Sequence, residues 1–332
     1  MDTRNESNHA AERAPLPVAF FGIAVGILAL AGAWRAAAKI WTLPHAVPVM
    51  LTAGALALWI ALMAAYAHKW LTHRDDAIAE MRHPVQSSFA ALAPVSTLLA
   101  AQAVQAYSHG LAIALFAIGA LSQLALGAYL HGRVWQGGRK PELTTPAMYL
   151  PTVAPSFVAA TAAAGLGWTQ LGAIFFGAGV FSWLAIESMI LHRAAVHDPL
   201  PEALRPSLGI QLAPPVVGGV SYLAITHGVP DVFAYMLLGY GLYQALMLSR
   251  LVPWIRQQAF APSYWAFSFG VAALPTMAIR MVERGATGAM ELLALGLFLA
   301  GNVVIGILIA GTIRAMLNGK LLPFQPAQVK QA

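Results

Sequence analysis

The sequence predicts an all-α polytopic membrane protein whose ten transmembrane helices are arranged as five helical hairpins. Of its 332 residues, 59% are hydrophobic and only 10% are charged, whereas soluble globular domains carry about 45–50% and 25%. The apolar residues gather in ten stretches long enough to cross a bilayer. Prolines recur inside alternate stretches at a nearly constant spacing. These three observations exclude an ordinary soluble protein.

The ten predicted spans are apolar runs bounded by charged or proline-containing connections. They cover residues 17–34, 48–67, 85–107, 110–130, 147–167, 171–191, 207–226, 232–249, 263–282 and 290–312. Very short connections follow the third, fifth and seventh spans, so each of these spans forms an antiparallel hairpin with the next. The division into domains is a disordered cytoplasmic tail at 1–16, a ten-helix transmembrane domain at 17–314 and a cytoplasmic C-terminal tail at 315–332.

Positive charge is distributed unevenly between the two sides of these spans. Fifteen Lys and Arg residues lie on the side of the N-terminus, against four on the other side, namely Arg35, Lys39, Arg280 and Arg284. By the positive-inside rule, both termini are cytoplasmic in a multi-pass protein of the cytoplasmic (inner) membrane. The net charge of +6 therefore reflects orientation in lipid, and we expect no nucleic-acid partner.

Prolines mark a repeated unit in the odd-numbered spans. Four of these spans carry a proline in mid-membrane, at Pro94, Pro155, Pro215 (preceded by Pro214) and Pro275, with separations of 61, 60 and 60 residues. No even-numbered predicted span has an internal proline. The period predicts five copies of one hairpin with a bent odd helix and a straight even helix, related by quasi-fivefold symmetry.

The bends also predict which helices lie inside. A proline removes one backbone hydrogen bond and displaces the carbonyl four residues earlier, which is costly in contact with lipid. We therefore expect the odd helices to form an inner ring around a central pore. The alternative is that the prolines merely kink tightly packed helices. The first odd span has Gly22 and Gly26 in place of a central proline, and these glycines either face the pore or serve helix packing.

Ionisable groups are scarce within the spans, and Glu187 is the only acidic residue well inside one. It could be a site of proton coupling, a partner in a structural ion pair with a group such as Arg193, or a contact between protomers. Such scarcity argues against a proton-relay pump. Serine and threonine hydroxyls in the odd spans suit rapid permeation without a fixed-charge well, although they can also bond their own helix backbone.

Enzymatic chemistry has no support in the sequence. There is no cysteine, no phosphate-binding loop, and no nucleophile with a supporting histidine and acid at one membrane depth. The pairs His68 with His73 and His192 with His197 are five residues apart, so they do not share a helix face as metal ligands would. We expect neither a metal nor a cofactor.

Several short runs in the correct order resemble the tellurite-resistance/dicarboxylate transporter family, which also includes the plant guard-cell slow anion channels. The similarity covers all ten spans from about residue 17 to residue 320. The runs that carry it are Val134–Gly138, Tyr149–Pro151, Phe175–Gly179, Gly239–Gly241, Arg250–Trp254 and Trp265–Gly270.

This resemblance implies a homotrimer embedded in lipid, with a separate anion pore in each protomer. It also implies that a phenylalanine of the ninth helix closes the pore, and Phe269 matches that residue. Spacing alone leaves Phe267 and Phe269 both open, because they point about 200° apart on a helix. Gly22 matches a glycine near the gate, while Ala24 stands where the family has a proline.

The leading hypothesis is thus a channel that conducts small anions through a pore occluded by Phe269. A second hypothesis is a proton-coupled secondary transporter or exporter of dicarboxylates or oxyanions such as tellurite, with Glu187 as the coupling group. A third is a membrane scaffold or receptor that transports nothing.

Overall fold

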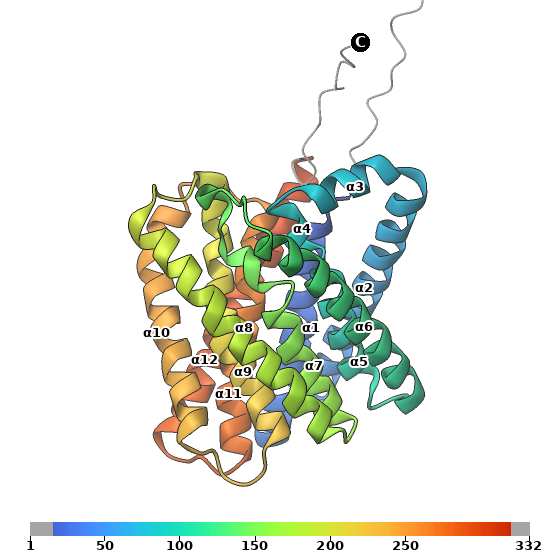
Figure 1. Ribbon diagram of the computed structural model, residues 1–332. Helices are drawn as coiled ribbons and strands as arrows, with labels where there is room; N and C mark the ends of the chain where they lie inside the picture. The colour runs from blue at the N-terminus through green and yellow to red at the C-terminus, as the bar shows by residue number, and fades with distance from the viewer. Residues whose placement is uncertain (1–15, 320–332) are drawn as a thin grey trace, which may run out of the picture.

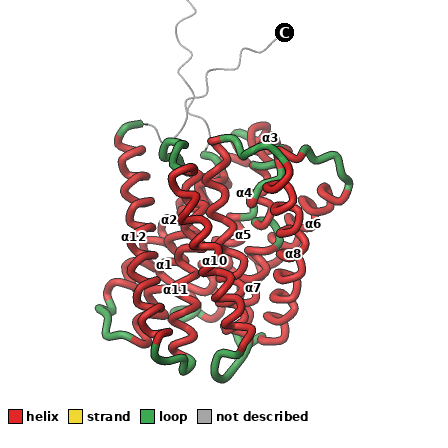
Figure 2. The backbone as a smooth tube through the Cα atoms, turned by 90° about the vertical axis from the view of Figure 1, so that its left-hand side faces the viewer, coloured by secondary structure: helices red, strands yellow, loops and turns green. Residues whose placement is uncertain are grey.

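The structure, a computed structural model, describes residues 16–319, and all its secondary structure within that range is helical. Ten helical stretches are long and apolar enough to cross a membrane, which confirms the predicted class and number of spans. They run side by side with their connections at the two ends (Figures 1 and 2). The tail predicted at 1–16 lies almost wholly outside the described residues. The tail predicted at 315–332 does so only beyond residue 319, because the last helix continues to Leu317.

Each span is built from one or two helical elements. In chain order the elements are η1 (Val18–Phe20), α1 (Phe21–Ile40), α2 (Ala46–Thr72), α3 (Arg74–Arg82), α4 (Gln86–Phe89), α5 (Leu92–Val104), α6 (His109–Trp135), η2 (Pro141–Leu143), η3 (Pro146–Tyr149), α7 (Val153–Gly165), α8 (Thr169–Val196), η4 (Glu202–Leu212), α9 (Ala213–Ile225), α10 (Val232–Ile255), η5 (Pro262–Phe267), α11 (Ser268–Glu283) and α12 (Ala289–Leu317).

The odd spans form an inner ring, as the prolines predict. In their most apolar windows 56–89% of positions are buried, against 22–33% in the even spans α2, α6, α8, α10 and α12. The helices α1, α5, α7, α9 and α11 contact one another in that order, and α11 contacts α1, which closes the ring. The even helices cover its outside. The quasi-fivefold symmetry of the hairpins stays a prediction.

Each inner span begins with one helical piece, which is 3-10 in four spans and the single turn α4 in the other, and a second, α-helical piece follows. The 3-10 pieces η1, η4 and η5 run directly into that second helix, whereas turn residues separate α4 from α5 and η3 from α7. Pro94, Pro155, Pro214 and Pro215 lie in the first turn of that second helix, where a missing N–H leaves no bond unmade. Pro275 differs because it lies inside α11.

Two glycines of the outer helices contact backbone carbonyls that the prolines were expected to displace. A Cβ on Gly127 of α6 would lie 2.9 Å from the carbonyl oxygen of Pro151, and one on Gly301 of α12 would lie 3.1 Å from that of Val271. These carbonyls precede Pro155 and Pro275 by four residues. Glycine at these positions therefore lets each outer helix approach the irregular backbone of the inner ring.

Polar contacts tie the helices together at both ends. Where the inner spans begin, which we call the N-terminal end, Lys69 of α2 forms a buried ion pair with Glu80 of α3 at 2.9 Å. The other carboxylate oxygen of Glu80 accepts the backbone N–H of Val18. At the opposite end, Lys39 and Glu283 pair at 2.8 Å. The helix α3, which is charged and lies along the N-terminal end, was not predicted from the sequence (Figure 1).

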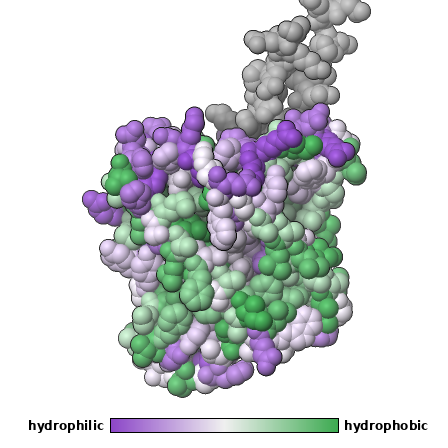
Figure 3. Space-filling model, viewed as in Figure 1, coloured by the Kyte–Doolittle hydropathy of each residue, from purple (hydrophilic) through white to green (hydrophobic). Residues whose placement is uncertain are grey.

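The outer surface has the polarity of a membrane protein. In the view of Figure 3, hydrophilic residues gather at the two ends, mostly the N-terminal one, and an apolar belt lies between them. The outer helices are longer than predicted, with 27–29 residues in α2, α6, α8 and α12. Their polar last turns continue beyond the apolar runs that the sequence shows, because backbone hydrogen bonding does not stop at the edge of the lipid.

Candidate functional site

A cavity lies inside the ring and is lined by residues from all five inner spans; we call it the central cavity. Its volume is about 40 Å³ for the centre of a water-sized sphere, so it holds only a few waters. Its lining is mostly aliphatic and aromatic, and no Asp, Glu, Lys, Arg or His of the described chain is part of it. The cavity is therefore narrow, apolar and free of fixed charge.

The first turns of the five inner α-helices all reach this cavity. Gly22 of α1, Leu92 of α5, Val153 of α7, Ala213 of α9 and Ser268 of α11 line it, and each is the first or second residue of its helix. The backbone N–H groups at three of these starts are already bonded, because those of Phe21, Ala213 and Ser268 donate to carbonyls of η1, η4 and η5. The cavity is therefore lined by mostly apolar side chains at the level where each inner span changes from its first helical piece to the next.

The structure separates the two phenylalanines that spacing could not. Phe269 lines the central cavity and is half-buried, whereas Phe267 is not part of the lining. Phe267 instead packs against Gly209, where an added Cβ would lie only 2.5 Å from its ring. Phe269 is thus the residue of the two that can obstruct the cavity.

The two glycines of α1 differ in position. Gly22 lines the central cavity, and an added Cβ there would lie 3.5 Å from the Cβ of Trp265. Gly26 does not line it. A Cβ on Gly26 would lie 2.4 Å from the hydroxyl of Ser268, so this glycine permits close packing of α1 on α11.

Most of the predicted prolines shape the ring without lining the cavity. Pro214 is the one that borders it. Pro94, Pro155, Pro215 and Pro275 lie on the inner helices but outside the lining, so they act on the cavity through the course of the backbone.

Glu187 lies on the outer helix α8, is buried, and accepts hydrogen bonds from three neutral donors. Trp183 Nε1 donates at 2.9 Å, the Tyr240 hydroxyl donates at 3.1 Å, and the hydroxyl of Tyr149 also donates to the carboxylate. No Lys or Arg of residues 16–319 forms an ion pair with it, so Arg193 does not take the role that the sequence allowed.

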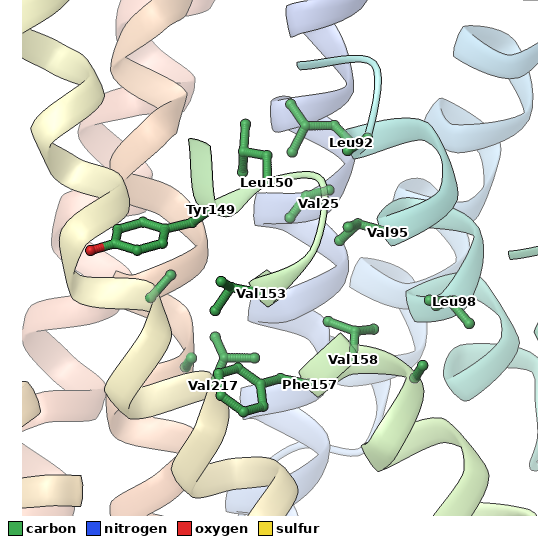
Figure 4. Packing of buried hydrophobic residues seen from close by; sticks show 14 of the residues in the cluster. Val25, Leu92, Val95, Leu98, Tyr149, Leu150, Val153, Phe157, Val158 and Val217 are labelled. Atoms are coloured by element: carbon green, nitrogen blue, oxygen red, sulfur yellow. The ribbon is translucent and has the colours of Figure 1, made fainter. Parts of the chain in front are cut away.

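Tyr149 connects this carboxylate to the central cavity. It belongs to η3, is fully buried and is part of the cavity lining. In Figure 4 its hydroxyl points away from Leu150, Val25 and Val153, the apolar residues beside it. The sequence did not indicate Trp183, Tyr149 and Tyr240 as partners of Glu187. Only the spacing of Trp183, one helical turn before Glu187, was a readable signal.

A ring of interrupted helices around a narrow, uncharged cavity defines a membrane transport protein of the channel or carrier class. The chain matches the SLAC1 family, described as voltage-dependent anion channel, over residues 15–313. It belongs to this family, and it is a multi-pass membrane protein.

Three relatives from different organisms are similar to most of this chain. The chain is 35% identical to the "Tellurite resistance protein TehA homolog" of Haemophilus influenzae over 307 residues, which are 92% of each protein. It is 23% identical to an uncharacterized transporter of Methanocaldococcus jannaschii, over 65% of this chain and 69% of that protein. It is 21% identical to the guard cell S-type anion channel SLAC1 of Arabidopsis thaliana, over 90% of this chain and 55% of that protein.

Proposed function

We propose that the protein is a passive channel for small anions, and that each protomer conducts through its own ring of inner helices. The observation that carries this proposal is the closed ring of five inner spans around a narrow cavity without fixed charge. The absence of a charged side chain from the lining avoids a deep well that would hold an anion in the path. The descriptions of the relatives as anion channels support the same function.

Phe269 is the proposed gate of this channel. Its ring borders a space that holds only a few waters, so it obstructs the path by its volume and by excluding water. The half-buried ring of Phe269 borders the cavity, whereas that of Phe267 packs against Gly209, so a rotation of Phe269 is the movement that would widen the cavity.

Conductance of the purified protein in planar bilayers tests both the anion channel and the Phe269 gate. We expect Phe269→Ala to raise chloride conductance several-fold, because truncation opens the narrow part of the cavity. Phe267→Ala is the matched control: it removes the same ring from the same segment but leaves the lining intact. Under gradients of chloride, nitrate and malate, the reversal potentials should follow the equilibrium potentials of these anions. An absence of current from a folded Phe269→Ala protein would contradict the channel and favour a scaffold or receptor.

A second function is supported by the hydrogen bond from Tyr149 to Glu187, which places a carboxylate one side chain away from the cavity. In this alternative the protein is a secondary transporter of dicarboxylates or oxyanions such as tellurite, and protonation of Glu187 couples transport to the proton gradient. Flux into vesicles should then follow an imposed pH difference, and Glu187→Gln should abolish that dependence while leaving downhill flux. In the channel, flux is independent of the pH difference in both proteins.

The proposed assembly is a homotrimer in the inner membrane with both termini in the cytoplasm. Its support is the family resemblance together with the apolar outer faces of the even helices, which expose large side chains such as Leu121, Phe181 and Leu299. Lipid and neighbouring protomers are the natural partners of such faces.

A further inference from the structure

A second cavity lies at the N-terminal end of the bundle, between α4, the last turns of α6 and the segment that leads from α6 to η2. We call it the basic pocket. Its volume is about 310 Å³, several times that of the central cavity. The two cavities lie on either side of η3 and the turn after it, since Met148 and Pro151 line the basic pocket and Tyr149 and Leu150 line the central one.

Three cationic side chains line the basic pocket, namely Arg133, Arg139 and Lys140, and no carboxylate of the described chain is part of its lining. They come together because α6 ends at Trp135 and the chain then reverses. Gly137 and Gly138 make this reversal with φ of 81° and 76°, a region that side chains other than glycine rarely adopt.

Hydroxyl and ring nitrogen donors complete the lining. Ser87 and Ser88 of α4 are buried, with 4% and 5% of their surface exposed, and both border the pocket. His131 of α6 also borders it, and its buried Nδ1 has no hydrogen-bond partner in the described chain. The pocket therefore offers several directional donors besides its charge.

Arg139 is held in place by the backbone. One of its terminal nitrogens donates to the carbonyl of Pro84 at 3.2 Å, and the other donates to that of Leu143. Its Nε is buried and has no partner among residues 16–319. Burial lowers the pKa of Arg139, which reflects the cost of holding its charge away from water, and a bound anion offsets that cost.

We propose that the basic pocket binds a phosphate group, either as the free anion or as the headgroup of a lipid. A phosphate group carries between one and two negative charges, which match the three cations of the pocket. Its several acceptor oxygens match the donors of these cations and the two serine hydroxyls. A halide has no directional acceptor set for so many donors. The basic pocket shares no lining residue with the central cavity, so binding there does not depend on the proposed channel.

The thermal unfolding midpoint of the detergent-purified protein, titrated with inorganic phosphate at constant ionic strength, tests the proposal. Phosphate should raise the midpoint of the wild type, because a ligand of the native state stabilises it. The variant R133Q/K140Q should weaken the apparent affinity about tenfold or more. Both residues are exposed on the pocket rim, so their replacement leaves the core intact.

Two further variants separate the pocket from general charge effects. R250Q/R256Q removes two exposed cations at the same end of the bundle but outside the pocket, and should leave the phosphate response unchanged. The charge-preserving R133K/K140R should retain most of the affinity. An equal phosphate response in the wild type and R133Q/K140Q would overturn binding of the free anion in this pocket.

Nanodiscs of phosphatidylcholine with and without phosphatidic acid distinguish the two sources. A rise of the midpoint with phosphatidic acid that R133Q/K140Q abolishes assigns the site to a lipid headgroup, and a response to inorganic phosphate in detergent assigns it to the free anion. If neither ligand distinguishes R133Q/K140Q from R250Q/R256Q, the proposal is wrong. None of these measurements depends on conductance, so the test of the basic pocket is independent of the test of the proposed channel.

Discussion

The hydroxyl of Tyr149 donates a hydrogen bond to the carboxylate of Glu187, so a residue that lines the central cavity also holds a buried acidic group of the outer layer. The two residues belong to the inner and outer parts of the third hairpin, and Tyr240 from the fourth hairpin donates to the same carboxylate. The cavity wall and the contact between neighbouring hairpins therefore share one polar network, whose individual bonds can be tested.

Tyr149→Phe should destabilise the protein by about 1–3 kcal/mol, because a buried acceptor loses one of its donors. The substitution keeps the ring but removes one of three donors to Glu187. Thermal and chemical unfolding in detergent measure the effect. Tyr243→Phe is the control, because that tyrosine is 56% exposed on α10. Equal stability of Tyr149→Phe and wild type would mean that this bond contributes nothing.

Gly127→Ala should destabilise the protein by about 1–3 kcal/mol through overpacking. Its added methyl group would lie 2.9 Å from the carbonyl oxygen of Pro151, and a backbone atom cannot rotate away as a side chain can. Gly132→Ala on the same helix has open space around it and should be neutral or stabilising by up to about 1 kcal/mol, since alanine favours the helix. If the unfolding midpoints of both variants shift in the same direction, the close contact between Gly127 and the carbonyl of Pro151 is contradicted.

Glu80→Gln should cost about 3–5 kcal/mol, because it leaves the buried ammonium of Lys69 without its counter-ion. The side chains of this pair are 5% and 10% exposed. The matched control is Glu283→Gln in the pair with Lys39, whose side chains are 63% and 33% exposed. We expect the control to cost only about 0–1 kcal/mol. Chemical denaturation of both variants in the same detergent compares them directly.

Asp231 predicts a pH dependence of stability at the opposite end of the bundle. Hydrogen bonds from the Tyr222 hydroxyl and from the N–H of Ala234 lower the pKa of Asp231 below its ordinary value. A lowered pKa in the folded state adds stability above the unfolded pKa of about 3.9, and this stability is lost as the pH falls through the folded pKa.

The stability difference between wild type and Asp231→Asn should therefore be larger at pH 7 than at a pH below the folded pKa. Tyr222→Phe should raise the pKa of Asp231 and move the loss of stability to higher pH. Asp198→Asn, at another exposed aspartate, serves as the control. A difference between Asp231→Asn and wild type that is constant with pH would show that the carboxylate is not stabilised in its charged form.

The proline period predicted the inner ring because its cause is local: a residue without an N–H cannot continue a helix exposed to lipid. From the same property of proline we expected each inner helix to bend at the proline itself. The structure places it before them, so that Pro94 and Pro155 begin a helix instead of bending one. Sequence cannot separate these cases, because proline is compatible with the first turn of a new helix and with a kink.

The site was harder to predict because its residues meet only through packing between hairpins. Phe267 and Phe269 are equivalent in the sequence, and the contact of Phe267 with Gly209 on another span is what leaves Phe269 for the cavity. The basic pocket likewise joins Ser88 of α4 and Arg139 of the segment after α6, which are far apart in the chain and meet only in the folded bundle.

The seam that closes the inner ring joins α1 to α11. Across it the hydroxyl of Ser268 lies 3.4 Å from the carbonyl of Gly22, a contact between residues 246 positions apart. Because α1 is synthesised first and α11 near the end, the inner ring can close only after residue 268 has been made. A chain that stops before residue 268 lacks this contact, so the closure of the ring is a late step of folding.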